Sequence, residues 1–423
     1  MLRNILFWTT DKLTGSKKKA NRNDIKFIIT NSISEKAKKK KKKYLDTILQ
    51  HVIETVPHYK NEKLKIDSFP IVNKNIIRAN FIDFQSVIYT DKKKKTVSTS
   101  GSTGTPFMVY HDKNKSTRNT ADNLYFWGEA GYKIGDKLYF FRLWNAFEKK
   151  NFLTHFAQNV VPIDVFDLTD SFIDDLLDTL QKRKRKSCLL GYVSAFEKIC
   201  KHLDRKNPNF RITSVKSIIA ISEKLNQYTK DSVKKYFGIE PVSRYSNIEN
   251  GIIAQQLKGK SHFIINDASY YVEILDINTN EPAKKGVIGR IVITDLFNYC
   301  TPMIRYDTGD LGAFDIIDEK KVLTKIEGRK IDSIKNTKGE IISFNLVLMV
   351  NKYPQLTQCQ LVQKSKKDYI LKLNSNNIFS KEEELLSDFK RYLGKDANIT
   401  IEYVSEIPLL ASGKRRVMVN EMV

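Results

Sequence analysis

The chain has 423 residues, of which 41% are hydrophobic and 11% aromatic, enough for a packed core and too many for a disordered protein. Its 72 lysines and arginines outnumber its 48 aspartates and glutamates, and the net charge of +24 would suit nucleic acid, an anionic membrane surface or a phosphorylated ligand. Most lysines lie in short scattered runs, which favours a lysine-rich composition over one dedicated polyanion-binding face.

The exception is Lys38–Lys43, six lysines in succession. The solvated start of a helix is the favoured interpretation of this run, ahead of peripheral contact with a membrane or another polyanion. Apolar residues then recur at helical spacing over Leu45–Val56, and Pro57 ends the pattern. We therefore expect an amphipathic helix in this part of the chain.

The composition also bears on the compartment. The cysteines stand far apart and form no CxxC pair, which argues against a structural zinc site or a disulfide framework: Cys188, Cys200, Cys300 and Cys359. No apolar run approaches the ~18–20 residues of a membrane span. The start, Met1–Trp8, is too short for a signal peptide and has no cleavage-like site. We therefore expect a cytoplasmic protein without a transmembrane segment.

The middle of the chain alternates strand and helix. A β-rich run at Val215–Ile221 is followed by a helical pattern over Tyr228–Phe237, which Gly238 closes, and by a strand at Pro241–Tyr245. This βαβ unit predicts that part of the sheet is parallel. Two further runs predict an antiparallel pair of strands: Tyr270–Leu275 and Val287–Thr294.

The pattern restarts near residue 326. A polar stretch from Gly328 to Gly339 leads into a segment whose clearest element is a helix with a capping box at Ser380 and Glu383 and a stop at Gly394. We place a domain boundary within about four residues of Arg329. The predicted fold is a large N-terminal mixed-sheet α/β domain, residues 1–326, with a small C-terminal α+β lid, residues 327–423.

The most informative stretch is Ser98–Pro106, Ser-Thr-Ser-Gly-Ser-Thr-Gly-Thr-Pro. Gly101 and Gly104 allow backbone N–H groups to turn inward, and the hydroxyls add donors, so the loop can wrap a polyphosphate. No Gly-Lys-Ser/Thr follows at Walker A spacing. Taken alone, the stretch fits a flexible Ser/Gly linker equally well.

Four more polar segments follow the loop. Each has a plain structural interpretation when taken singly, such as a capped helix, a surface turn, a linker or a basic tail. Their occurrence in one order, at these separations, favours a shared site: Tyr245–Gly251, Ile304–Leu311, Gly328–Lys335 and Ser412–Arg416.

Together these segments resemble the motifs of the adenylate-forming superfamily of acyl-CoA synthetases, adenylation domains and luciferases. The likeness is greatest to the phenylacetate–CoA ligase and CapK-type branch. Thr99–Pro106 is similar to its phosphate loop, Tyr245–Gly251 to its Tyr-Gly-x-x-Glu segment and Tyr306–Asp310 to its Tyr-Arg-Thr-Gly-Asp. Gly328–Lys335 resembles its hinge and Ser412–Lys414 its Ser-Gly-Lys. Supporting likenesses are Phe69–Lys74, Gly191–Tyr192 and Ser222–Glu223, so the resemblance covers nearly the whole chain after residue 45.

The resemblance implies an ATP site. The β- and γ-phosphates would be held by the loop residues Ser100, Gly101, Ser102, Thr103, Gly104 and Thr105. Glu249 would supply a hard oxygen ligand to Mg²⁺. Tyr245 would stack on adenine beside Ser222 and Glu223, and Asp310 would accept both ribose hydroxyls, with Arg329 on the same sugar.

The resemblance also implies that Lys414, on the small domain, brings its charge to the α-phosphate and the acyl carboxylate. That domain must then close to deliver it. The expected acyl pocket lies near aromatic and small residues, Tyr139, Gly191 and Tyr192.

Three departures from the branch stand out. Ser246 replaces the usual glycine, Asp307 stands where many relatives have arginine, and Ile331 takes the place of an acidic hinge residue. These departures concern one positive contact near the ribose and the way in which the hinge bends.

The resemblance implies ATP-dependent activation of a carboxylic acid to an acyl-adenylate, followed by transfer, with coenzyme A as the default acceptor. CapK-type relatives are associated with surface polysaccharide synthesis, so the alternative acceptor is an amine or hydroxyl of a glycan. The rival from another class is a non-enzymatic basic protein that binds polyanions. Retention of Glu249, Asp310 and Lys414 together argues against that rival and against a nucleic-acid partner.

Overall fold

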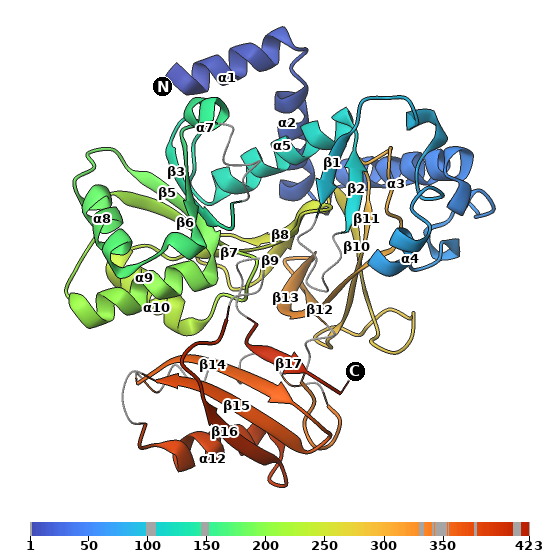
Figure 1. Cartoon of the computed structure of the whole chain (residues 1–423). Helices are drawn as coiled ribbons and strands as arrows, with labels where there is room; N and C mark the ends of the chain where they lie inside the picture. Colours follow the sequence, from blue (N-terminus) through green and yellow to red (C-terminus); the bar gives the residue numbers. More distant parts are fainter. Residues whose placement is uncertain are drawn as a thin grey trace.

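The structure is a computed structural model that describes residues 2–98, 107–144, 152–329, 334–340, 342, 353, 355–375, 379–408 and 416–422. Figure 1 shows a large sheet with helices around it, followed by a small sheet, orange to red, at the C-terminal end of the chain. The large sheet changes from parallel to antiparallel pairing along its width, and the connection that carries Glu249 lies at this change.

The chain opens with helices: α1 (Leu2–Leu13), α2 (Lys17–Thr30), α3 (Glu35–Thr55) and α4 (Lys74–Ala79). Single 3-10 turns join the larger elements: η1 (Pro57–Tyr59), η2 (Ile66–Ser68), η3 (Val87–Tyr89) and η4 (Val165–Asp167). The strands β1 (Lys95–Ser98) and β2 (Met108–His111) form a separate antiparallel ribbon.

The lysine run forms the first half of α3, as predicted. The helix begins after Ser34, whose hydroxyl accepts a backbone N–H from the first turn. Lys40 is ion-paired with Asp24 of α2, and Lys41 lies 2.8 Å from Asp267. Part of the run therefore holds neighbouring segments together.

The large sheet has eleven strands in the order β10-β11-β12-β13-β9-β8-β7-β6-β5-β3-β4. Its parallel half consists of β3 (Lys137–Arg142), β4 (Val160–Asp164), β5 (Ser187–Tyr192), β6 (Val215–Ile221) and β7 (Val242–Asn247). Its antiparallel half consists of β8 (Gly251–Gln256), β9 (Phe263–Ile265), β10 (Tyr270–Leu275), β11 (Gly289–Asp295), β12 (Tyr306–Ile317) and β13 (Lys320–Arg329). Because β7 pairs parallel with β6 and antiparallel with β8, the sheet changes direction at β7.

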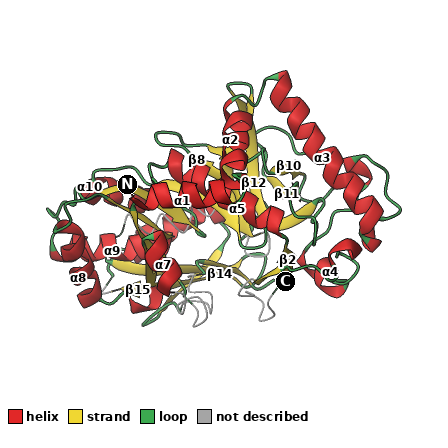
Figure 2. Ribbon diagram, turned by 90° about the horizontal axis from the view of Figure 1, so that it is seen from above, coloured by secondary structure: helices red, strands yellow, loops and turns green. Residues whose placement is uncertain are grey.

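Helices cover both parts of the sheet: α5 (Lys113–Glu129), α7 (Phe152–Gln158), α8 (Asp170–Gln181), α9 (Val193–Lys206) and α10 (Gln227–Phe237). The apolar faces of α8, α9 and α10 form one core with β3, β5 and β6. A second core joins α2 and α5 to β8, and a third joins α3 and α4 to β10 and β11. Figure 2, seen from above, shows α1, α2 and α5 lying across the face of the large sheet that is turned away from the small one.

The small sheet has the order β16-β15-β14-β17. Its elements are β14 (Leu356–Gln363), β15 (Asp368–Ser375), α12 (Glu382–Leu393), β16 (Asn398–Tyr403) and β17 (Met418–Asn420). Leu385 and Phe389 of α12 pack with Leu361 and Leu371 of the sheet, and all four side chains are fully buried. This part of the chain therefore has a hydrophobic core of its own.

The predicted fold class, a large mixed α/β sheet with a small C-terminal sheet domain, is confirmed. β6 and β10 have the predicted bounds, β6 and β7 are parallel, and β10 and β11 are antiparallel. Gly238 closes α10 with a φ of +65°. Glycine suits that position because other residues pay a steric cost at positive φ.

One predicted cap is wrong. The residue at the N-cap of α12 is Lys381, with no side-chain cap bond, so Ser380 lies one residue too early for the expected capping box. Glu382, Glu383 and Glu384 in the first turn complement the helix dipole instead.

The predicted domain boundary lies close to the end of a strand. In the large sheet, β13 continues to Arg329, and the division between residues 326 and 327 stays a prediction.

None of the helices in the described part of the chain combines the length and the apolar character that crossing a bilayer requires.

Candidate functional site

Glu249 lies in the short connection between β7 and β8, where the sheet changes direction. Its residue is only 1% exposed, and its Oε1 accepts a hydrogen bond from the Tyr306 hydroxyl at 2.9 Å. The ammonium group of Lys74 lies 2.9 Å from the same oxygen. A buried carboxylate is thus held by one hydroxyl and one cation, as the chemistry of a buried charge requires.

Three segments distant in sequence meet at this carboxylate. Val72 forms a parallel bridge with Tyr306, which brings the segment leading to Lys74 alongside β12. The ring of Phe107, which directly follows the Ser/Thr-rich loop, stacks on the Tyr306 ring with centroids 6.4 Å apart and an interplanar angle of 6°. Phe107, the carboxylate and the lysine therefore lie together.

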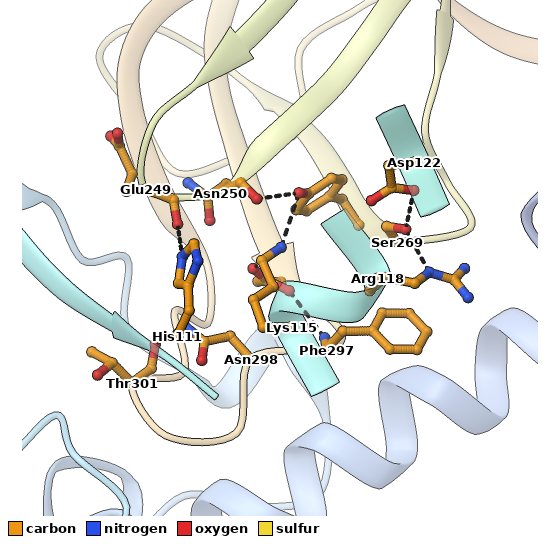
Figure 3. Close-up of polar contacts among 12 residues, drawn as sticks. His111, Lys115, Arg118, Asp122, Glu249, Asn250, Ser269, Phe297, Asn298 and Thr301 are labelled. Atoms are coloured by element: carbon orange, nitrogen blue, oxygen red, sulfur yellow. Dashed lines mark hydrogen bonds and ion pairs between the residues drawn. The ribbon is translucent and has the colours of Figure 1, made fainter. Parts of the chain in front are cut away.

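The backbone of Glu249 is held as well. His111 of β2 contacts the carbonyl oxygen of Glu249 through Nε2 at 2.8 Å (Figure 3). Burial, with the nearby charge of Lys115, lowers the pKa of His111 to about 4, so its ring is neutral near pH 7. Because a carbonyl can only accept, the Nε2 of His111 carries the proton.

Tyr245 of β7 and Asp310 of β12 form a second pair, although other strands lie between β7 and β12 in the order of the sheet. The Tyr245 hydroxyl lies 2.8 Å from Oδ2 of Asp310 and 3.1 Å from Oγ1 of Thr308. Burial, and then the charge of Asp310, raises the pKa of Tyr245 well above its ordinary value, so its hydroxyl keeps its proton and donates to the carboxylate. Asp310 therefore lies beside the ring that the resemblance assigns to adenine.

The departure at Asp307 has a structural explanation. Oδ2 of Asp307 is ion-paired with Arg290 at 2.9 Å, and its Oδ1 accepts the backbone N–H of Gly309 at 2.9 Å. Where many relatives place an arginine, this chain therefore has a carboxylate that binds an arginine from the adjacent strand β11.

Ser222 and Glu223 lie at the carboxyl end of β6. Ser222 is exposed and has a φ of +68°, a conformation that non-glycine residues seldom adopt. Oε2 of Glu223 accepts the backbone N–H of Ser194 at the start of α9, at 2.7 Å. Lys224 pairs with Glu327 of β13 at 2.8 Å. This turn links the parallel half of the large sheet to β13 in its antiparallel half.

The expected acyl-pocket residues lie at different depths. Tyr139 is 3% exposed and belongs to the core between the sheet and α8 and α9, two residues before the register position of Gly191. A Cβ on Gly191 would stand 2.5 Å from the Cβ of Phe141, so glycine permits close packing of β5 on β3. Tyr192 is the last residue of β5, at the carboxyl end of that strand. The pocket itself stays a prediction.

Several predicted site residues lie outside the described residues. These are the phosphate loop, Ser100 to Thr105, and Lys414. Arg329 is described in its backbone, which ends β13 and pairs in register with Asp310. The positions that the structure does bring together are Glu249, Tyr245 and Asp310, with Ser222 and Glu223 at the neighbouring strand end.

Some contacts were not foreseen. Lys74 and Tyr306 each stood in a segment that resembles the branch, but nothing in the sequence assigned them to Glu249. His111, 138 positions away from Glu249, gave no signal, because its partner is a backbone carbonyl. A search for charged residues in the resembling segments could have found Lys74.

The carboxylate fits Mg²⁺ only as a shared ligand. Among the residues that the structure describes, no group of three or more His, Cys, Asp or Glu side chains could hold a metal. Mg²⁺ keeps most of its waters and is commonly bound by one or two carboxylates together with substrate phosphates. Glu249 pairs with the ammonium group of Lys74, which also lies over the ring of Phe107, and its single carboxylate is of the kind that could share such a metal with phosphates.

Comparison with known proteins finds relatives in the branch that the sequence motifs resemble. Residues 334–421 match the CapK C-terminal domain family. Over 381 residues the chain is 24% identical to Protein CapK of Staphylococcus aureus, covering 84% of this chain and 80% of that protein. It is 22% identical over 405 residues to phenylacetate-coenzyme A ligase of Aromatoleum evansii, with 88% and 91% covered.

Among solved structures, the chain shares its fold with 2-hydroxyisobutyryl-CoA ligase in the postadenylation state, in complex with R3-HIB-AMP. The TM-score is 0.72 at 16% identity, and 93% of this chain and 90% of that chain are covered. The resemblance to the adenylate-forming superfamily, in its CapK and phenylacetate–CoA ligase branch, is thus confirmed through distant relatives.

Proposed function

We propose that the protein activates a carboxylic acid with ATP. The acid's carboxylate oxygen attacks the α-phosphorus, the bond to the bridging oxygen breaks, and an acyl-adenylate and pyrophosphate result. The observation that carries this proposal is the convergence of Glu249, Tyr306 and Lys74 near Phe107, the residue that follows the Ser/Thr-rich loop in sequence, beside the Tyr245–Asp310 pair. Relatives named as ligases, with an adenylate bound in one of them, support it.

Some of these residues would bind the nucleotide, and others would hold the metal or neutralise the charge of the phosphates. Tyr245 and Asp310 would hold adenosine, the loop at residues 100–105 would hold the phosphates, and Glu249 would hold Mg²⁺. When bound, the metal neutralises charge that develops on the phosphates. Lys74, whose ammonium group already contacts Glu249, would add a fixed positive charge at the same place. Lys414 would reach the α-phosphate from the small domain.

The acceptor in the second step has two candidates. Coenzyme A is favoured by the phenylacetate-coenzyme A ligase and 2-hydroxyisobutyryl-CoA ligase relatives. An amine or hydroxyl of a glycan is favoured by the match of residues 334–421 to the CapK C-terminal domain, the part that would face the acceptor in a closing lid. In either case the acceptor attacks the acyl carbon and AMP leaves.

Pyrophosphate release with a panel of carboxylic acids, with and without coenzyme A, tests both steps. We expect release with one class of acid only, and a multiple-turnover increase when the true acceptor is added. ATP consumption that is independent of every acid, or salt-sensitive nucleic-acid binding without turnover, would contradict the proposal.

A further inference from the structure

A buried ion pair lies directly behind the turn that carries Glu249. Nζ of Lys115, on α5, is 2.6 Å from Oδ2 of Asp295 at the end of β11, and both side chains are completely buried. Replacing such a pair by apolar residues is often neutral or stabilising, so stability alone is a weak reason for its presence. Its position suggests another role.

The pair fixes the direction of a hydrogen-bond chain that ends at Asn250. Lys115 lies 3.0 Å from the hydroxyl of Tyr270, and that hydroxyl lies 2.6 Å from the carbonyl oxygen of Asn250. An ammonium group can only donate, so Tyr270 accepts from Lys115 and gives its single proton to the carbonyl. Burial keeps that proton in place, since it raises the pKa of Tyr270 well above the ordinary value.

Two successive carbonyl groups are thereby held by donors from two different elements. His111 of β2 holds the carbonyl of Glu249 at 2.8 Å (Figure 3). Tyr270 of β10 holds that of Asn250. The next residue, Gly251, has a φ of +117°, and a Cβ there would stand 3.1 Å from the Tyr270 hydroxyl. Because glycine has no Cβ, the Tyr270 hydroxyl can come close to the backbone of the turn at this position.

We propose that Tyr270, oriented by the Lys115–Asp295 pair, and His111 are positioning residues that fix the Glu249 carboxylate for its cation. Groups behind a metal ligand commonly tune metal affinity by orienting the ligand. This inference rests on the proposed function, because it takes Glu249 to be the carboxylate that binds Mg²⁺ with ATP.

The remainder of the network supplies an internal comparison. Arg118 of α5, also fully buried, binds Asp24 at 2.9 Å and the Ser269 hydroxyl at 2.8 Å, and Ser269 binds Asp122 at 2.8 Å. These contacts tie α5 to α2 and to the turn before β10, and none of them reaches the carbonyls of Glu249 and Asn250. A variant on this side should change stability alone.

The experiment measures ATP affinity by calorimetry on the full chain, across a series of free Mg²⁺ concentrations and in EDTA. For Tyr270→Phe we expect the Mg²⁺ concentration that half-maximally tightens ATP binding to rise about tenfold. Affinity in EDTA should stay that of the wild type. Tyr125→Phe, which removes a hydroxyl from a buried tyrosine of α5 on its α2 side, is the matched control and should not shift the Mg²⁺ dependence.

His111 gives a second route to the same answer if Tyr270→Phe fails to fold. His111→Leu should produce a similar shift, and His111→Gln, which retains an N–H donor, should restore part of it. Unchanged Mg²⁺ dependence in a folded Tyr270→Phe or His111→Leu, while Glu249→Gln does change it, overturns the inference alone. Wild-type ATP binding that is indifferent to Mg²⁺ overturns the proposed role of Glu249 and the inference together.

Discussion

At the scale of single residues, buried hydroxyls decide how the two site carboxylates are presented. Tyr306 and Tyr245 are buried tyrosines whose pKa burial raises, so each remains a donor, one to Glu249 and the other to Asp310. Each hydroxyl thereby fixes the position of one carboxylate oxygen. Under the proposed function, these positions would be the ones that receive the cation and the ribose hydroxyls.

Asp310→Ala should weaken ATP binding. It would remove a carboxylate able to accept charge-assisted hydrogen bonds, each worth roughly 1.5–3 kcal/mol, and would leave the Tyr245 hydroxyl without one of its acceptors. Titration calorimetry with ATP measures the loss. Equal affinity in the variant and the wild type would remove Asp310 from the ribose site.

The contact between Lys74 and Glu249 should appear as a coupling in a double-mutant cycle. Lys74→Met leaves a carboxylate that is only 2% exposed without its cation, and should cost about 1–3 kcal/mol of unfolding free energy. Glu249→Gln in the same chain should recover much of that loss, because the amide carries no charge. Urea unfolding of the four proteins gives the coupling, and strictly additive losses would contradict the contact.

His58 predicts a pH dependence away from the site. Its ring stacks on Phe84 at 4.0 Å, and burial lowers its pKa below the ordinary 6.5. The unfolded chain therefore binds a proton at a pH where the folded chain does not, so this contribution is complete above pH 6.5 and is lost as the pH falls through the lowered pKa. His58→Phe keeps the stacking, and its urea midpoint should fall less between pH 7 and 5 than that of the wild type. Parallel curves would rule out this contribution.

At the scale of elements, the sequence predicted best where periodicity and turn chemistry agree. β6, α10 and Gly238 follow the expected pattern because each strand or helix has its own local signal. The start of α12 was misplaced because three glutamates in the first turn make a side-chain cap at Ser380 unnecessary.

The predictions for the site differ in the same respect, between local signals and contacts that are distant in sequence. Glu249 and Asp310 were proposed from local segments that resemble a known branch, and their roles stay predictions. The pair Lys115–Asp295 and the hydroxyl of Tyr270 were not. Lys115 lies 155 positions from Tyr270 and further still from Asp295, and the other partner of Tyr270 is a backbone carbonyl. Such contacts exist only once the sheet has formed, and no spacing rule reports them.

Strand packing beside the site gives a prediction with a built-in control. Gly191→Ala would place a Cβ 2.5 Å from Cβ and 2.8 Å from the carbonyl oxygen of Phe141, and should destabilise the fold by about 1–3 kcal/mol through overpacking. Gly128→Ala, inside α5 with its nearest atom 4.0 Å away, should instead stabilise by about 0.5–1 kcal/mol. Urea unfolding compares the two, and a neutral Gly191→Ala would show that β3 and β5 can separate.

At the scale of the whole molecule, the proposed nucleotide residues Glu249, Tyr245 and Asp310 lie in the large sheet and its connections, and Lys414 is proposed to come from the small domain. Lys414→Ala should lower ATP–pyrophosphate exchange by at least about a hundredfold, as loss of a charge at the reacting phosphate can, while ATP affinity and the urea midpoint stay close to wild type. The comparison of exchange with affinity separates catalysis from binding. Near-normal exchange would remove Lys414 from the catalytic residues.

The central claim is that a carboxylate oxygen attacks the α-phosphorus of ATP, and labelled oxygen tests it directly. The acid that supports pyrophosphate release is supplied with both carboxylate oxygens as ¹⁸O, and the products are analysed by mass spectrometry after transfer to the acceptor. The proposed chemistry predicts one ¹⁸O atom in AMP and none in pyrophosphate. Label in inorganic phosphate, with ADP as the nucleotide product, would show attack on the γ-phosphorus and would contradict the adenylate mechanism.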